Sequence, residues 1–357
     1  MSIQTPISSK PNFREATNFL RGICAFSVLL WHYQNFFWNS NVSRFEVTRQ
    51  PFYNIFQIPY TMGSVGVPIF WCISGLILIH SYQNSVSPTL QKFFISRLSR
   101  LYPLHFVTLL LVAALQQISL RAQTTYQIYS QNDIFHFILN LFFIQSWGFE
   151  NGRSFNAPSW SVSTEMIVYL IFFYTLGFVK RVKLVGAISL FIIFSSELTS
   201  SVNLNRLIFF RECTAYFFLG VSLYFLSDIK LKIFRYLGVF ISLLLILWGS
   251  TESQDSHPLL VGALVALFAF IDLTPFTRFF RPLRRLGELS YSIFLWHVPL
   301  QIALILMLDL FSIDLTIAYN YFFFLTFILL TYFVGYLSFR YIEQPAQRYL
   351  RHKFIRA

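Results

Sequence analysis

Long apolar runs alternate with short polar loops along this chain of 357 residues. Each run is about 17 to 22 residues long, near the length that a helix needs to cross a ~30 Å hydrocarbon core. The pattern therefore predicts an all-α integral membrane protein with about ten transmembrane helices. The predicted spans are 18–38, 62–82, 101–119, 158–179, 184–200, 207–226, 236–250, 257–273, 288–308 and 317–340.

A further apolar segment, residues 134–147, is too short for an ordinary span. Such segments are typically re-entrant or interfacial. Backbone polar groups at membrane depth must be buried in protein or line a water-filled cavity when no helix satisfies them. We therefore expect residues 134–157 to cover an outward-facing cavity.

The basic residues predict the topology. They cluster at 10–14, 92–100, 180–183, 230–235, 278–285 and 348–356. These clusters share one side of the membrane only if the 134–147 segment does not cross, and positive charge marks the cytoplasmic side. Glu252, Asp255, Asp309 and Asp314 lie in loops on the opposite side. The prediction is a multi-pass protein with both termini in the cytoplasm.

Composition agrees with a lipid environment, since 55% of residues are hydrophobic and only 12% are charged. The net charge of +12 would indicate a nucleic-acid partner in a soluble protein, but here the basic residues lie in loops between spans. We expect membrane lipid and no nucleic acid as partner. The three cysteines lie in apolar segments without metal-ligand spacing, so we expect no metal. The chain, 1–357, reads as a single transmembrane domain.

Arg21 and His32 both lie in the first predicted span. They are about three helical turns apart, roughly 16 Å along the axis, and about 20° apart around it, so they share one face. Ionisable residues inside a membrane are functional candidates. The alternative is that Arg21 extends to the interface and His32 is a hydrogen-bonded core histidine.

Arg97 and Arg100 lie one turn apart where the third span begins. Two guanidinium groups on one helix face are suited to phosphate binding. The alternative is that they are ordinary cytoplasmic charges that orient the helix.

Two further groups of candidate residues lie in later predicted spans. Ser161 and Glu165 share a helix face just after Trp160, and Glu165 needs either a sugar-like hydroxyl or a cation such as Arg211. His297 precedes Pro299, which frees the carbonyl of Leu295 and predicts a bend. His297 then lines a cavity or bonds to that freed carbonyl.

Other catalytic signatures are absent from the sequence. There is no GxSxG, P-loop, GxGxxG or HExxH motif, which argues against hydrolase, nucleotidase and zinc protease functions. The main alternative function is a secondary transporter of a small polar or acylated solute. A transporter predicts inverted repeats and paired broken helices, and the sequence contains neither.

Six motifs, in this order, resemble the acyltransferase 3 family of membrane O-acyltransferases over nearly the whole chain. The motifs are Arg21-Gly22 with His32, the run from Gly66 to Gly75, Arg97-x-x-Arg100 with Tyr102-Pro103, Trp160-Ser161 with Glu165, Ser290-Tyr291 with Trp296-His297, and Ile342-Glu343-Gln344-Pro345. One departure is Asn18-Phe19, where the family often has Asp-Gly, so a carboxylate partner for Arg21 is missing.

The resemblance implies a bacterial inner-membrane enzyme. It implies transfer of an acetyl group from acetyl-CoA to a hydroxyl of a surface polysaccharide such as lipopolysaccharide O-antigen. It also implies that His32 is catalytic and that Arg21, Arg97 and Arg100 bind the donor. Some members carry an SGNH hydrolase-like domain. This chain ends at Ala357 without one, so we expect the membrane domain to act alone or with a separate partner.

These expectations define a candidate site. His32, Glu165 and His297 are the catalytic candidates, and Arg21, Arg97 and Arg100 are the candidates for acetyl-CoA binding. Trp160, Ser161 and Arg211 are the candidates for binding the carbohydrate acceptor. Neutral His32 acts as general base on the acceptor hydroxyl, or an acetyl-histidine intermediate relays the acetyl group.

Overall fold

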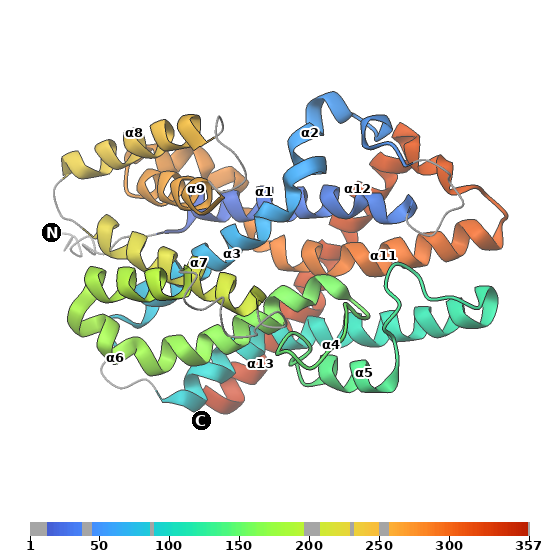
Figure 1. The fold of residues 1–357 in the computed structure, drawn as a ribbon, viewed down its shortest axis with the longest axis horizontal. Coiled ribbons are helices and arrows are strands. Elements are labelled where there is room, and N and C mark those ends of the chain that lie inside the picture. Colours follow the sequence, from blue (N-terminus) through green and yellow to red (C-terminus); the bar gives the residue numbers. More distant parts are fainter. Residues whose placement is uncertain are drawn as a thin grey trace, which may run out of the picture.

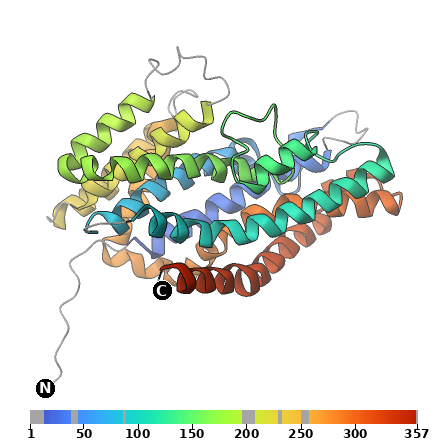
Figure 2. The same ribbon diagram turned by 90° about the horizontal axis from the view of Figure 1, so that it is seen from below.

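The computed structural model describes residues 13–37, 45–85, 89–195, 208–228, 232–249 and 257–355, and every regular element in these ranges is a helix. Most of the long helices run along the longest axis of the molecule (Figures 1 and 2). The α-helices are α1 (Glu15–Trp31), α2 (Tyr53–Met62), α3 (Gly66–Tyr82), α4 (Leu90–Gln123), α5 (Ile134–Leu141), α6 (Trp160–Ser195), α7 (Ile208–Ser227), α8 (Lys232–Gly249), α9 (His257–Asp272), α10 (Arg284–Glu288), α11 (Ser290–Leu310), α12 (Tyr321–Ser338) and α13 (Gln344–Ile355).

Short 3₁₀ or π segments connect several of these helices. They are η1 (His32–Phe37), η2 (Val47–Arg49), η3 (Gly63–Val65), η4 (Ala157–Ser159), η7 (Pro275–Leu283), η8 (Leu315–Tyr319) and η9 (Phe339–Glu343).

Helices lie over the predicted apolar segments, so the all-α prediction is confirmed. Within the described ranges, four helical stretches are long and apolar enough to cross a membrane: 53–82, 90–123, 275–310 and 321–355. Two shorter apolar helices cover 233–247 and 258–272. These features indicate a membrane protein, and the number of about ten crossings stays a prediction. Parts of the basic clusters at 10–14, 230–235 and 348–356, the end of the 184–200 span, and the acids Glu252 and Asp255 lie outside the described residues.

The 134–147 segment differs from the long helices. Its helix α5 has eight residues, about 12 Å at 1.5 Å per residue, which is too short to cross a bilayer. The chain then continues as an irregular loop to η4. We call residues 142–156 the α5–α6 loop. Helices α2 and α13 were not predicted from the apolar pattern.

Helix α1 is held at its start by a carboxylate from a distant part of the chain. Asp272, at the end of α9, accepts hydrogen bonds from the backbone N–H groups of Glu15, Ala16 and Thr17 at 2.8–3.1 Å and from the Thr17 hydroxyl at 2.7 Å. A carboxylate at a helix N-terminus satisfies unpaired donors and complements the helix dipole. This contact positions the helix that carries Arg21 and leads to His32.

Helices α3 and α7 cross with their backbones in contact at two glycines. A Cβ placed on Gly220 would lie 1.8 Å from the carbonyl oxygen of Cys72, and one on Gly75 would lie 1.9 Å from that of Phe217. Small residues allow such close approach between membrane helices. The crossing buries Trp71, Phe217 and their neighbours in the largest hydrophobic cluster of the described residues.

Gly220→Ala is expected to destabilise the protein by about 2–3 kcal/mol, because the added methyl group forces two backbones apart inside a packed core. The measurement is thermal unfolding in detergent micelles. Gly177→Ala is the matched control, since a Cβ on this α6 glycine meets nothing within 4 Å. An alanine there is expected to leave the stability unchanged or raise it slightly. Equal melting temperatures for the two variants would contradict the close-packed crossing.

Candidate active site

A cavity of about 100 Å³ gathers charged and polar side chains from α1, α3, α4, α6 and α11. We call it the arginine cavity. Its polar and charged lining residues are Arg21, Ser74, Arg97, Arg100, Ser161, Glu165, Tyr169, Ser290 and Tyr291. Val67, Phe70, Trp71, Phe294 and other apolar residues complete the wall. The structure therefore brings the three predicted donor-binding arginines together with Ser161 and Glu165.

The three guanidinium groups make none of the ion pairs found among the described residues. Arg21 instead donates a 3.4 Å hydrogen bond to the side-chain oxygen of Asn18, the residue that stands where the resemblance leads one to expect a carboxylate. A second pocket, of about 260 Å³, shares Arg21 and Arg100 with the arginine cavity. We call it the mouth pocket; it is lined by Asn18, Arg21, Arg100, Glu288, Phe339, Glu343, Gln344 and Gln347.

Glu165 is the carboxylate of the arginine cavity. It is buried, interacts with the hydroxyls of Ser74 and Tyr169, and lies in the electrostatic field of Arg100 and Arg97. Its Oε1 atom is buried without a hydrogen-bond partner in the described part of the chain. Of the two partners considered from the sequence, Arg211 is not within ion-pair distance of Glu165. One carboxylate among three guanidinium groups leaves the cavity positively charged.

His32 lies where α1 ends and η1 begins. Its Nδ1 atom is 2.8 Å from the carbonyl oxygen of Val28, and because a carbonyl only accepts, Nδ1 carries the proton. In the neutral imidazole, Nε2 is then the basic nitrogen. Gln301 of α11 donates a 2.7 Å hydrogen bond to the His32 carbonyl, and Asn35 donates to Gln301 at 3.2 Å. This orientation is suited to a general base.

His297 lies beside His32, with ring centroids 4.9 Å apart. Its Nδ1 contacts the carbonyl of Ile293 at 3.3 Å, and its Nε2 is buried without a hydrogen-bond partner among the described residues. Pro299 does free the carbonyl of Leu295, and Asn156 of the α5–α6 loop donates to it at 2.9 Å. Since neither ring nitrogen of His297 contacts the Leu295 carbonyl, the alternative in which His297 bonds to it is wrong.

The two histidines do not line the arginine cavity; they lie beyond one of its walls. Phe294 lines the cavity and contacts the His297 ring at 6.1 Å between centroids, and Phe70 contacts Phe294 at the same distance. The imidazoles and the guanidinium groups are therefore neighbours across Phe294.

A third cavity, of about 340 Å³, lies under the α5–α6 loop. We call it the loop cavity; it is lined by Gln145, Ser146, Gly148, Glu150, Asn151, Gly152, Arg153, Trp160 and Phe209. Residues 145–153 contribute most of this cavity's wall, so a cavity does lie at the 134–157 segment, and its outward direction stays a prediction. Trp160 contacts Trp71 edge to face at 5.8 Å, and Trp71 lines the arginine cavity, so these two tryptophans separate the cavities. Arg211 lines neither of these two cavities.

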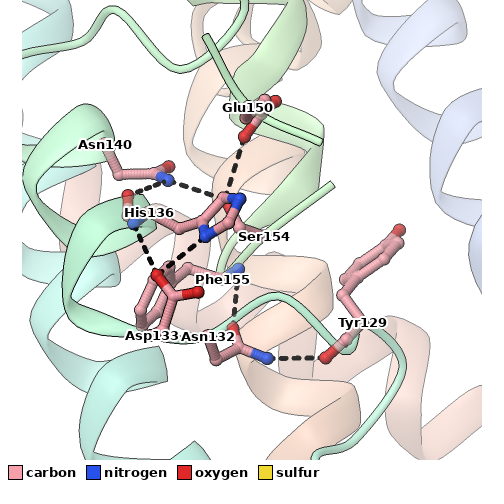
Figure 3. A network of polar contacts seen from close by, with 8 residues as sticks. All are labelled: Tyr129, Asn132, Asp133, His136, Asn140, Glu150, Ser154 and Phe155. Atoms are coloured by element: carbon pink, nitrogen blue, oxygen red, sulfur yellow. Dashed lines mark hydrogen bonds and ion pairs between the residues drawn. The ribbon is translucent and has the colours of Figure 1, made fainter. Parts of the chain in front are cut away.

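Hydrogen bonds hold the α5–α6 loop against α5 (Figure 3). Asn140 donates to the Ser154 hydroxyl at 2.8 Å, and Ser154 donates to Glu150 at 3.1 Å. At the start of α5, the His136 backbone N–H and imidazole both donate to Asp133, which holds the pKa of Asp133 below its usual range. The loop that carries Glu150 and Arg153 is therefore anchored at several points.

Several site residues were missed in the sequence analysis. Ser74, Tyr169 and Tyr291 line the arginine cavity, while Gln301 and Asn156 contact the backbone next to the histidines. Gln301 could have been identified from the sequence, because it is a polar residue in an apolar span and lies one helical turn after His297. Arg153 carried no such signal, because it lies in a loop. In the described ranges, no three His, Cys, Asp or Glu side chains gather as a metal site.

The chain is similar in sequence to known acyltransferases. A family model described as an acyltransferase domain matches residues 14–340. The acyltransferase MdmB of Streptomyces mycarofaciens is 36% identical over 114 residues, 31% of this chain and 28% of MdmB. The peptidoglycan O-acetyltransferase OatA of Listeria monocytogenes is 26% identical over 338 residues, covering 80% of this chain and 51% of OatA.

A putative acetyltransferase, ORF330 of Acidianus two-tailed virus, is 24% identical over 298 residues, covering 79% of this chain and 82% of that protein. The chain thus matches about half of OatA and a smaller part of MdmB. No solved structure matches the chain.

Proposed function

The chain belongs to the acyltransferase 3 family, whose domain model covers residues 14–340, and from this premise we propose that it is a membrane-embedded O-acetyltransferase. It moves an acetyl group from cytosolic acetyl-CoA to a hydroxyl of a cell-surface polysaccharide sugar, such as one of lipopolysaccharide O-antigen. The name of OatA, a peptidoglycan O-acetyltransferase, supports acetyl as the acyl group and a surface glycan as the acceptor.

The observation that carries this proposal is the set of three guanidinium groups in one cavity, none of which has an ion-pair partner in the described part of the chain. Acetyl-CoA is a polyanion, and guanidinium groups bind phosphate oxygens with paired hydrogen bonds. Arg21 and Arg100 line both the mouth pocket and the arginine cavity, so phosphates bound there would direct the acetylated arm inward. The arm would then pass Phe294 to His32.

His32 acts as the general base in the proposed reaction. Its Nε2 takes the proton of the acceptor hydroxyl while the hydroxyl oxygen attacks the thioester carbonyl. A C–O bond forms and the C–S bond breaks, and the proton passes from His32 to the leaving CoA thiolate. His297 lies beside His32, and its Nε2 is buried with no hydrogen-bond partner among the residues that the structure describes. It either orients the acceptor or takes part in an acetyl-histidine relay.

Glu165 holds the arginine cluster in the proposed site by balancing part of its charge. Trp160 and Ser161 are proposed to bind the acceptor at the wall between the two cavities, with Arg211 further along α7. The basic loops favour cytoplasmic termini in a bacterial inner membrane, with lipid around the helices and the arginines toward the cytoplasm.

The test measures acetylation in cells and with purified protein. Mass spectrometry of envelope glycans is expected to find O-acetyl groups in cells with the gene that are missing in cells without it. Protein reconstituted in lipid nanodiscs is expected to move radiolabelled acetyl from acetyl-CoA to glycans extracted from the cells without the gene. Identical glycans in the two strains and no transfer in nanodiscs would refute the proposed function.

A further inference from the structure

The loop cavity contains the guanidinium group of Arg153. Arg153 is exposed, and its Cζ atom lies 5.2 Å from the ring centre of Trp160 and 5.9 Å from that of Phe209. The two rings are themselves 4.4 Å apart. Among the described residues, no carboxylate is within ion-pair distance of Arg153. Two aromatic rings therefore position this cation at the cavity wall without neutralising it.

Glu150 is the acidic residue of the same cavity, and its carboxylate is turned toward Ser154 (Figure 3). Burial raises the pKa of Glu150 to about 7, against the opposing effects of the Ser154 hydrogen bond and the Arg153 charge. Near neutral pH, a large fraction of molecules therefore carries an uncharged Glu150. When Glu150 is uncharged, the positive charge of Arg153 is not balanced by it, so the cavity has a net positive charge.

Arg153 also lies beside the tryptophan pair that separates the two cavities. Trp160, which Arg153 covers, contacts Trp71 at the wall of the arginine cavity. A ligand held by Arg153 would thus lie on the opposite side of the tryptophan wall from the proposed donor site.

The placement of Arg153 argues against a purely neutral acceptor. A neutral sugar ring commonly stacks on an exposed aromatic face, but the guanidinium occupies a face of Trp160. What the cavity offers instead is a planar set of N–H donors that matches a carboxylate or a phosphate.

We infer that the loop cavity selects an acceptor bearing an anionic group, a carboxylate or a phosphate, next to the hydroxyl that is acetylated, and that Arg153 binds this group. The inference rests on the proposed function, because it names the chemistry of the acceptor for the same transfer. Arg153 is a specificity-determining residue, and the donor site does not depend on it.

The experiment uses the full chain in nanodiscs, acetyl-CoA, and glycans extracted from envelopes of cells lacking the gene. One portion of the extract is carboxyl-reduced, which converts uronic acids to neutral sugars, and another is treated with phosphatase. One of these treatments is expected to raise the acceptor KM of the wild type about tenfold or more. The reason is that a hydrogen bond to a charged group contributes about 1.5–3 kcal/mol to the free energy of binding. The effective treatment identifies the anionic group.

Arg153→Gln is expected to raise the acceptor KM to a similar extent with untreated glycans and to respond to neither treatment. Arg153→Lys should restore part of the affinity. Arg121→Gln, a change at an exposed arginine near the end of α4, is the matched control and should behave as the wild type. Binding of acetyl-CoA should be equal in all variants.

Three results would overturn the inference. The first is a wild type that is insensitive to both treatments, and the second is an Arg153→Gln variant with unchanged acceptor KM. The third is an Arg153→Gln variant whose kcat falls equally with all acceptors, because Arg153 would then stabilise the transition state and not select the acceptor. If the wild type transfers no acetyl group to any glycan, the proposed function fails, and the inference fails with it.

Discussion

His32→Ala is expected to reduce acetyl transfer to below about 1% of the wild-type rate, because a positioned general base accelerates the reaction by roughly 10²–10⁴-fold. The Nδ1 hydrogen bond to Val28 and the contact between Gln301 and the His32 carbonyl both orient the imidazole toward its role. Removal of the side chain leaves the backbone contact to Gln301 in place, so the helix end should keep its structure. The measurement is single-turnover transfer in nanodiscs.

The control for this prediction is acetyl-CoA affinity, which should not change, because His32 lines neither the arginine cavity nor the mouth pocket. His352→Ala, at an exposed histidine of α13, should leave transfer unaffected. Wild-type product formation by His32→Ala would disprove the catalytic assignment. Acid-quenched mass spectrometry of wild-type protein with acetyl-CoA and no acceptor separates the two mechanisms, since only the relay leaves an acetylated histidine.

Arg100→Gln is expected to weaken acetyl-CoA binding by about 10–100-fold, since a hydrogen bond to a charged group contributes about 1.5–3 kcal/mol. Arg100 is chosen because it lines both the mouth pocket and the arginine cavity, where it would contact the donor throughout its path. The measurement is equilibrium binding of labelled CoA to protein in nanodiscs. The affinity of the wild type should also fall with increasing salt, and Arg100→Gln should reduce this salt dependence.

Arg97→Gln should have a similar effect, because Arg97 lies in the same cavity one turn before Arg100. The matched control is Arg351→Gln, a change at an exposed arginine of α13 that lines neither the arginine cavity nor the mouth pocket. An unchanged dissociation constant in both Arg97→Gln and Arg100→Gln would refute the donor site. If the affinity of Arg351→Gln fell equally, the effect would come from general surface charge.

Hydrophobic pattern predicted the helices well, because each apolar run must be helical to satisfy its backbone in lipid. The shortness of α5 and the cavity under the α5–α6 loop followed from the same requirement. Helix α6 covers two predicted spans, and non-helical backbone at Lys183, where φ is 50°, divides it into two helices at the boundary between those spans. Helix α13 escaped prediction because it is polar and lies outside the apolar runs.

The site was predicted in part. Ionisable residues in apolar spans stand out because burying charge in lipid is costly, which identified Arg21, His32, Arg97, Arg100, Glu165 and His297. Their grouping was less predictable: the arginines and Glu165 share a cavity, while the two histidines form a pair behind Phe294. Helical spacing orders residues on one helix but does not show which faces of different helices meet.

By itself, the sequence determined that this protein is a helical membrane protein and which charged residues must find a polar environment, since both follow from local composition and spacing. The motifs, matched along residues 14–340, gave its family. The tertiary structure alone decided which side chains become partners. Asn156 satisfies the carbonyl freed by Pro299, Asp272 caps α1, and Arg153 meets Phe209. These contacts join distant segments, and such pairings depend on how whole helices pack.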